Sequence, residues 1–294
     1  MKHAVITGAH GYLGSLLRAR LEADGWTTTS LVRRWRAGER AERWALGEVP
    51  DLRVFEGADA LVHCAWDFRP RKPRGVWSAN VHGSKVLLRA AHRAGVPRLL
   101  SLSSMSAYAG TAQHYGRAKL ELERVTLELG GIAVRPGLVY GEAPAGMAGA
   151  LHKLTRLPLV PVIGGASARQ FPVHEDDLAD ALVRILDADT WTSEVIGIAQ
   201  PASVGFRELL QGFARQLSRQ PRFFPVPWQL VFWTLRLAEA VQLPVPLRAD
   251  SVLGLVHPAP SVPPSAAFPD LHASLRRFAS DRGERMPTTS EVTS

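Results

Sequence analysis

The sequence contains a single cysteine, Cys64, among its 294 residues. One thiol can form neither an intramolecular disulfide nor a cysteine-rich zinc site, so we expect a reducing compartment and predict a cytoplasmic location. No run of about 18 uncharged apolar residues is present, so stable membrane insertion is not expected. The apolar run after Met1 holds two glycines and a histidine and has no small-residue cleavage site, which does not suit a signal peptide.

Lysine is also scarce, since it supplies only five of the 35 basic residues; the 27 acidic residues leave a net charge of +8. The densest basic cluster, residues 33–43, carries Glu39 and Glu42 within it. There is no helix-turn-helix, zinc finger or interleaving of aromatic and basic residues, so nucleic acid is not an expected partner. The ten histidines lack the HxxxH and HExxH spacings, and we expect no metal site.

Strand-like and helix-like segments alternate in the first half of the chain. This order predicts an α/β fold with a Rossmann-type, doubly wound parallel sheet, and the continuous apolar strands agree because such strands are buried on both faces. The expected strands are 3–7, 27–32, 60–65, 98–102 and 131–135, and the expected helices are 13–23, 77–94 and 115–129.

The pattern loosens after about residue 140. Expected strands at 173–174 and 195–199 flank a helix at 176–187, and ten of the 21 prolines fall in 221–269, between helix candidates at 228–241 and 248–256. We predict a dinucleotide-binding domain over 1–160, to which 173–200 returns. A smaller, mostly helical substrate lobe is expected over 161–286, and a disordered tail over 287–294.

A glycine-rich loop, Thr7-Gly8-Ala9-His10-Gly11-Tyr12-Leu13-Gly14, joins the first expected strand to the first expected helix. Gly8 permits the tight turn, Gly11 lets the backbone approach a pyrophosphate, and Gly14 lets the helix pack closely on the strand. A diphosphate would then lie on the N–H groups of the helix start, which includes Tyr12 and Leu13. A glycine-rich turn without a ligand is the alternative.

The end of the second expected strand indicates the cofactor type. An acid about 20 residues after the glycine loop binds the ribose 2′-hydroxyl in NAD enzymes, but the sequence here reads Leu31-Val32-Arg33-Arg34. A guanidinium can bind a 2′-phosphate in bidentate fashion. Arg33 and Arg34 therefore favour NADP, with NAD left open and two merely solvated arginines as the alternative.

A YxxxK pattern, Tyr115 and Lys119, falls on an expected helix, where residues four apart share one face. A lysine ammonium at that place lowers the pKa of the phenol and brings proton exchange nearer to neutral pH. Upstream, Ser103-Ser104-Met105-Ser106 ends an expected strand, and a serine hydroxyl there can hold a substrate oxygen.

With its GxxGxxG loop and YxxxK pair, the sequence resembles the extended short-chain dehydrogenase/reductase superfamily, in particular the NAD-dependent epimerase/dehydratase family. The resemblance covers residues 3 to about 200. It aligns Ser104 with the family's catalytic Ser/Thr, beside Tyr115 and Lys119, with Ser103 and Ser106 as fallbacks. Tyr115 and Lys119 are also expected to contact the cofactor.

The resemblance assigns four more residues to the cofactor site. Ala65 follows the strand whose end lies along the cofactor, and Asn80 belongs to an Asn-x-x-Gly segment that carries a structural asparagine. Pro136 and Val139 lie in the segment 135–141, which resembles the loop whose backbone faces the nicotinamide.

The implied reaction is hydride transfer between a nicotinamide and a small alcohol or carbonyl compound, with Tyr115 as acid and base. Met105 and Ser106 stand where dehydratases carry an Asp-Glu pair, which disfavours elimination. A nucleotide-sugar epimerase remains an alternative, although Gln170 replaces the arginine usual for those substrates.

Two other interpretations remain. One is a non-catalytic, NADP-binding regulatory or assembly protein. The other is a membrane-surface protein that uses 228–241 as an interfacial helix instead of burying it in the lobe. A small-molecule substrate is the expected partner, Trp66, Phe68 and Trp77 are candidates for an apolar pocket, and a homodimer is left open.

Overall fold

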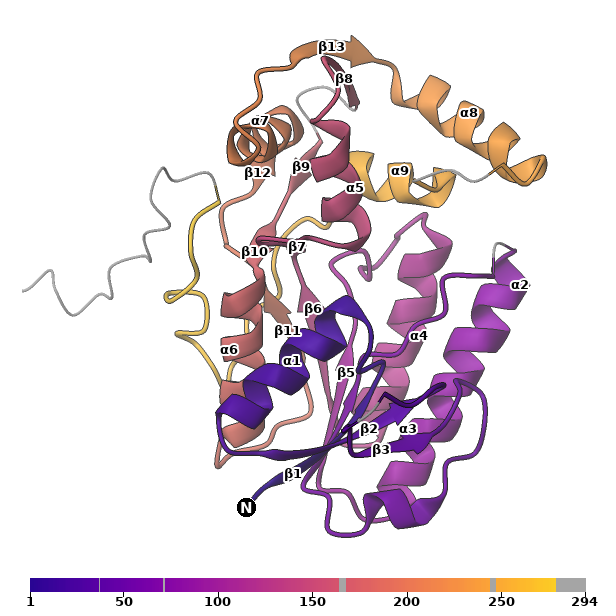
Figure 1. Ribbon diagram of the computed structural model, residues 1–294, viewed down its shortest axis with the longest axis vertical. Helices are drawn as coiled ribbons and strands as arrows, with labels where there is room; N and C mark the ends of the chain where they lie inside the picture. The colour runs from indigo at the N-terminus through magenta and orange to yellow at the C-terminus, as the bar shows by residue number, and fades with distance from the viewer. Residues whose placement is uncertain (37, 71, 164–167, 244–246, 279–294) are drawn as a thin grey trace, which may run out of the picture.

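Seven parallel strands form the central sheet of the computed structural model, which describes residues 1–36, 38–70, 72–163, 168–243 and 247–278 (Figure 1). The strand order is β11-β6-β5-β4-β1-β2-β3. The strands are β1 (His3–Thr7), β2 (Thr27–Val32), β3 (Ala41–Arg43), β4 (Ala60–His63), β5 (Arg98–Leu102), β6 (Ile132–Pro136) and β11 (Val195–Ile198). The Rossmann-type α/β fold is therefore confirmed.

Helices cover both faces of this sheet because its inner strands are apolar on both sides. In β1, Ala4 and Ile6 face one hydrophobic cluster and Val5 faces another. The first cluster lies under α1 (Tyr12–Ala23) and α6 (Glu175–Asp187), and the second under α3 (Gly83–Arg93) and α4 (His114–Glu128).

The helix expected at 77–94 begins earlier and is not uniform. It consists of α2 (Pro73–Val76), a π-helical stretch η2 (Trp77–His82) and α3. Pro73 sets the start, since proline is well suited to the first helical turn. A short 3₁₀ turn, η1 (Leu52–Phe55), precedes β4.

The remaining elements lie beyond the carboxyl ends of the central strands (Figure 1). Helices alternate there with two-stranded pairings. The strand pairs are β7 (Leu138–Tyr140) with β10 (Pro172–His174), β8 (Leu159–Ile163) with β13 (Arg222–Val226), and β9 (Arg169–Gln170) with β12 (Val204–Gly205). The helices are α5 (Gly146–Leu154), α7 (Phe206–Gln216), α8 (Trp228–Ala240) and α9 (Ala249–Val256).

The C-terminal part of the chain departs from the predicted lobe boundary of 161–286. Phe268, Leu271 and Leu275 belong to the hydrophobic cluster beneath α1 and α6, and Gly197 of β11 donates a backbone hydrogen bond to Pro263 at 3.0 Å. The end of the described chain thus packs against the central sheet, because its apolar side chains complete the layer around α6. The predicted tail at 287–294 lies outside the described residues.

Helix α8 is only partly embedded in the lobe, since Trp228, Val231, Phe232 and Leu235 pack against the hydrophobic cluster there. None of its residues is buried, and several of its large apolar side chains are exposed. In the part of the chain that the structure describes, no helix has both the length and the apolar character needed to cross a membrane.

Candidate active site

The glycine loop lies where the strand order of the sheet reverses, between β1 and β4, which is where open α/β sheets bind ligands. A Cβ atom on Gly8, whose φ is +68°, would lie 2.8 Å from the backbone nitrogen of Ala65. One on Gly14 would lie 2.2 Å from the carbonyl oxygen of Gly8. Glycine is needed at both positions for this close packing of loop, strand and helix.

The N-terminus of α1 fits a diphosphate. Gly11 is the N-cap residue, and within the described chain no side chain caps this helix and no acid occupies its first turn. The backbone N–H groups that begin the helix, at Tyr12, Leu13 and Gly14, have the charge and direction that an anion needs. The residues present therefore suit the dinucleotide that the sequence predicts.

The side chain of Tyr12 joins the glycine loop to α6. Its hydroxyl donates a 2.5 Å hydrogen bond to Glu175, which also accepts the backbone N–H of Glu142 at 2.9 Å. Burial, followed by this carboxylate, raises the pKa of Tyr12, so the phenol stays protonated. The backbone of Tyr12 is thus the part that remains for the predicted cofactor contact.

Arg33 and Arg34 directly follow β2 and are both exposed. Neither forms an ion pair with any other described residue. The pKa of Asp67 is lowered mainly by its hydrogen bond to Arg69, and also by the charge of Arg33. The guanidinium of Arg33 therefore acts on Asp67, in the loop that follows β4.

Glu39 is an acid near the cofactor site that the sequence reasoning missed. Its side chain is only 5% exposed and hydrogen-bonds His10 of the glycine loop at 2.7 Å and Arg18 at 3.4 Å. Burial alone would raise its pKa, but the hydrogen bond with His10 and the charges of His10 and Arg18 lower it overall. The acid absent from the end of β2 is thus supplied seven residues later, with its charge already paired.

Tyr115 lies in the first turn of α4 between two aromatic rings. The ring of Trp66 meets it edge-on at 5.2 Å, and that of Phe68 is stacked at 6.3 Å. Burial raises the pKa of Tyr115 to about 12, although the nearby Ser104 side chain opposes the rise. At neutral pH the phenol is therefore a protonated donor beside the Ser104 hydroxyl.

Lys119 lies one turn further along α4 and is only 4% exposed. Its Nζ donates to the carbonyl oxygen of Leu102 at 2.6 Å and lies 4.1 Å from the Trp66 ring centroid. Burial lowers the pKa of Lys119 to about 7. We expected this ammonium to lower the pKa of Tyr115. In the cofactor-free protein the pKa of Tyr115 is raised instead, because burial is the largest influence on the pKa of both Tyr115 and Lys119.

The three candidate serines are in different environments. Ser103 is buried and donates to Glu123, which also binds Arg135 through two hydrogen bonds of 2.7 Å. Ser106 donates its backbone N–H to the Ser104 hydroxyl at 3.1 Å. Ser104 is the serine whose side chain influences the pKa of Tyr115, whereas the Ser103 hydroxyl is engaged by Glu123, so Ser103 is a poor substitute for Ser104.

Asn80 is fully buried in the π-helical stretch and holds the loop after β4. Its amide oxygen accepts the N–H of Asp67 at 2.6 Å, and its amide nitrogen donates to the carbonyls of Asp67 and Val76 at 3.0 and 3.1 Å. These bonds give Asn80 a structural role under the segment that carries Ala65 and Trp66. A direct cofactor contact by Asn80 stays a prediction.

Pro136 and Val139 lie on the other side of the candidate site. The carbonyl of Pro136 accepts the N–H of Met105 at 3.4 Å, next to Ser104. Val139 pairs with Val173 in the short β7–β10 ladder. The segment 135–141, predicted to face the nicotinamide, thus runs beside the serine segment 103–106. Its contacts with the cofactor stay predictions.

Asp250 is a second residue that no sequence pattern indicated. Its two carboxylate oxygens accept the backbone N–H groups of His114 and Tyr115 at 3.0 and 3.1 Å, and its carbonyl accepts the Gln113 amide at 2.8 Å. Asp250 begins α9 but caps α4, whose own N-cap side chain makes no capping bond. The lobe thereby positions the helix that carries Tyr115 and Lys119.

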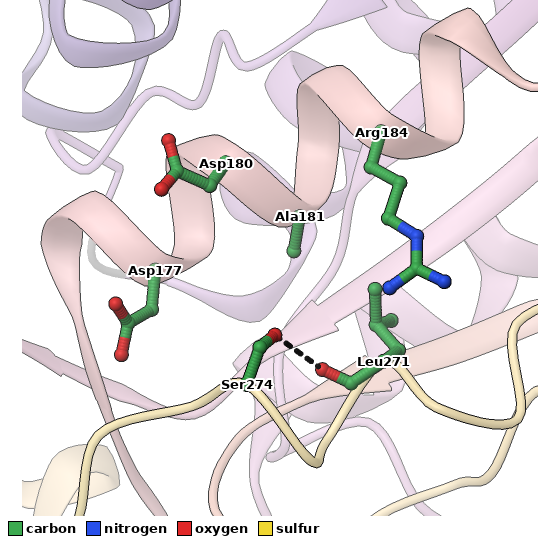
Figure 2. A pocket seen from close by; sticks show the side chains of 6 residues that line it. All are labelled: Asp177, Asp180, Ala181, Arg184, Leu271 and Ser274. Atoms are coloured by element: carbon green, nitrogen blue, oxygen red, sulfur yellow. Dashed lines mark hydrogen bonds between the residues drawn. The ribbon is translucent and has the colours of Figure 1, made fainter. Parts of the chain in front are cut away.

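A small pocket of about 80 Å³ lies elsewhere, between α6 and residues 271–274 (Figure 2). Its acids are already engaged, since Asp177 accepts the backbone N–H of Arg276 at 2.6 Å and Asp180 pairs with Arg20 at 2.5 Å. It contains none of the predicted site residues. Its lining consists of Asp177, Asp180, Ala181, Arg184, Leu271 and Ser274.

Comparison with known proteins identifies the family. The sequence model of the NAD dependent epimerase/dehydratase family matches residues 4–199, two thirds of the chain and the whole glycine-loop and Tyr-Lys region. The chain belongs to this family. This epimerase/dehydratase family member is thus an NAD-dependent oxidoreductase or epimerase in the broad sense.

Its relatives carry different chemistries. A protein of Caulobacter vibrioides named ceramide reductase is 29% identical over 76% of this chain and 73% of its own length. A Stigmatella aurantiaca protein named 4-hydroxy-2-methyl-3-oxo-4-farnesyl-3,4-dihydroquinoline-1-oxide ketoreductase is 28% identical over 46% of this chain and 50% of its own. The solved structure of MoeE5 with UDP-glucuronic acid and NAD has a TM-score of 0.67 at 21% identity, covering 90% of this chain and 95% of that one.

Proposed function

We propose that this family member is an NADP(H)-dependent reductase of an apolar ketone or aldehyde. The observation that carries the proposal is Tyr115, a protonated phenol near Ser104 whose ring contacts those of Trp66 and Phe68. A bound nicotinamide would supply the hydride. Tyr115 would give its proton to the substrate oxygen as negative charge develops there, and Ser104 would hold that oxygen in place.

Lys119 supports this proton transfer through its charge. Its pKa is about 7 in the cofactor-free protein, so at neutral pH the lysine is protonated in only a fraction of the molecules. An anion formed at Tyr115 would favour the charged lysine, because opposite charges at close range stabilise each other in a site of low dielectric. The ammonium would then stabilise the phenolate until a proton returns.

The choice of NADP rests on Arg33 and Arg34, which are exposed, unpaired among the described residues and adjacent to the end of β2. The nearby acid, Glu39, is engaged by His10 and Arg18. Two guanidinium groups would attract a 2′-phosphate, whereas a carboxylate with paired charge would repel it only weakly.

An apolar substrate is favoured over a nucleotide sugar. Aromatic rings surround Tyr115, and the relatives named above include reductases of a ceramide and of a farnesylated quinoline compound. Gln170, at the position expected to hold a diphosphate-binding arginine, bonds the carbonyls of Gly254 and Leu255 at 3.4 and 3.2 Å, and the Arg169 side chain bonds Ser203. Both side chains are thus engaged within the protein.

The test is a panel of long-chain ketones, small ketones and UDP-sugars, followed by NADPH absorbance and by product analysis. A reductase consumes one NADPH for each alcohol formed, with faster turnover of the long-chain ketones. An epimerase would interconvert a UDP-sugar without net change of the cofactor. Tight NADPH binding with no turnover across the panel would favour the non-catalytic regulatory or assembly protein.

A further inference from the structure

Helix α8 presents an apolar stripe that no other described part of the chain covers. Leu230, Trp233, Leu237 and Val241 are 62%, 66%, 68% and 60% exposed. Their spacing of three, four and four residues places them on one face of the helix and its last turn. Such a stripe normally faces a protein core.

The other side of α8 packs against α9, which fixes the direction of the stripe. Glu239 accepts the backbone N–H of Ala249 at 3.0 Å, and the ring of Trp228 meets that of His257 edge-on at 5.7 Å. In Figure 1, α8 lies at the outer end of the molecule with α9 on its inner side. The apolar stripe therefore faces away from the body of the protein.

Exposed apolar side chains continue beyond α8 onto the adjoining β8–β13 pair. Leu157, two residues before β8, and Leu159, the first residue of β8, are 51% and 55% exposed, and Phe224 of β13 is 42% exposed. Arg222 of β13 pairs with Leu159, which places these residues together. The β8–β13 pair and α8 occupy the same end of the molecule (Figure 1). We call this combined surface the α8 face. It consists of the stripe on α8 (Leu230, Trp233, Leu237 and Val241) together with Leu157, Leu159 and Phe224.

The charges around the α8 face are mainly positive, although Glu208 lies on α7 and Glu239 lies on α8, where it accepts the backbone N–H of Ala249. Residues 146–163 and 209–238 supply six basic side chains and contain no aspartate or glutamate. All six are exposed, and none forms an ion pair with another described residue. They are Lys153, Arg156, Arg215, Arg219, Arg222 and Arg236.

We propose that the α8 face docks on the surface of a lipid bilayer that contains anionic lipids. Exposed leucines and a tryptophan can enter the interface between headgroups and acyl chains, while arginines at the edge meet lipid phosphates. A second copy of the chain is a less suitable partner. A symmetric contact would bring the basic side chains of the two copies against each other, and their charges would repel. The 13-residue helix lies on the bilayer and does not cross it.

Docking through α8 would place the candidate active site near the lipid. Arg248, the N-cap of α9, donates to the carbonyls of Pro70 at 3.0 Å and of Phe68. Phe68 is stacked on Tyr115 and is 63% exposed. The segment after α8 thus contacts the loop that forms one wall of the site. This inference rests on the surface alone and does not require the proposed reductase activity.

The experiment is flotation of the purified full chain with two kinds of vesicle, phosphatidylcholine alone and phosphatidylcholine with phosphatidylglycerol. We expect binding to the vesicles that contain phosphatidylglycerol, at least about tenfold weaker binding to phosphatidylcholine alone, and loss of binding as salt is raised. The double variant Trp233→Ser/Leu237→Ser should bind at least about tenfold more weakly. Arg219→Gln/Arg222→Gln should weaken binding by about fivefold for each charge removed.

Matched control variants remove equivalent exposed groups far from α8. Val49→Ser/Leu52→Ser removes two exposed apolar side chains near η1, and Arg89→Gln/Arg93→Gln removes two exposed charges from α3. Both should bind vesicles like the wild type. All four variants should keep the wild-type far-UV circular dichroism spectrum, since the altered side chains are exposed.

Three outcomes would overturn the proposal. The first is no binding of the wild type to vesicles that contain phosphatidylglycerol. The second is equal binding by the wild type and Trp233→Ser/Leu237→Ser. The third is a wild-type dimer in sedimentation equilibrium that becomes a monomer in this variant, which would make the α8 face a contact between copies. NADPH turnover is not part of the readout, so failure here is distinct from failure of the proposed function.

Discussion

Replacing Lys119 by methionine should stabilise the protein without cofactor while it removes turnover. The folded protein lowers the pKa of Lys119 from 10.5 to about 7, because the amine is buried. In the unfolded chain Lys119 keeps its ordinary pKa, so at pH 7 the unfolded state binds this proton more tightly than the folded state does. At pH 7 this difference lowers the free energy of unfolding by about 4 kcal/mol.

Methionine at position 119 removes the free-energy cost of the buried amine, but it also removes two favourable contacts of Lys119. The hydrogen bond from Lys119 to Leu102 and the position over the Trp66 ring disappear, which costs about 2 kcal/mol together. Lys119→Met should therefore be more stable than the wild type by about 2 kcal/mol at pH 7. The cost of the buried amine shrinks as pH rises from 7 toward 10.5, and by about pH 9 the two proteins should be nearly equal in stability.

The assay is urea unfolding of the cofactor-free protein at both pH values, with Lys85→Met as the control. Lys85 forms a partly exposed ion pair with Glu121 at 2.6 Å, so its loss should lower stability by less than about 1 kcal/mol at either pH. The reasoning is refuted if Lys119→Met is less stable than the wild type at pH 7, or if the difference between the two does not change with pH.

Four further variants test three separate parts of the site. Arg33→Ala should weaken NADPH binding by about 1.5–3 kcal/mol in calorimetry and leave NADH binding unchanged; an equal loss for both cofactors would contradict the assignment. Ser104→Ala should lower turnover by about 10²-fold, whereas Ser103→Ala should keep turnover and lower the melting temperature; the reverse order would show that the serine roles are exchanged. Asp250→Ala should cost about 1–2 kcal/mol in urea unfolding because it uncaps the helix of Tyr115, and unchanged stability would mean that the cap is dispensable.

The central sheet was the most predictable part of the molecule. The strands His3–Thr7, Thr27–Val32 and Arg98–Leu102 lie at the predicted residues, because each is an apolar or β-branched run that is buried on both faces. The β8–β13 pair was missed for a related reason. Each of these strands contains a proline, Pro161 or Pro225, which argues against a strand unless it lies at the edge of a sheet.

The candidate site was predictable where it depends on local spacing. Tyr115 and Lys119 are close together because one helical turn separates them, and Gly8 and Gly14 serve one tight loop. The contact between Asp250 and α4 joins residues 135 positions apart in the chain, which no local pattern reveals. The pKa of Lys119 likewise depends on burial by distant segments, so the sequence could not indicate its direction.

The most direct test of the account is the turnover of Tyr115→Phe on a long-chain ketone with NADPH. The substitution removes one oxygen with little change of volume, so folding and NADPH affinity should match the wild type. Turnover should fall by about 10²–10⁴-fold, the usual contribution of a positioned proton donor. If Tyr115→Phe keeps most of the wild-type turnover, Tyr115 is not the proton donor and the proposed mechanism is wrong.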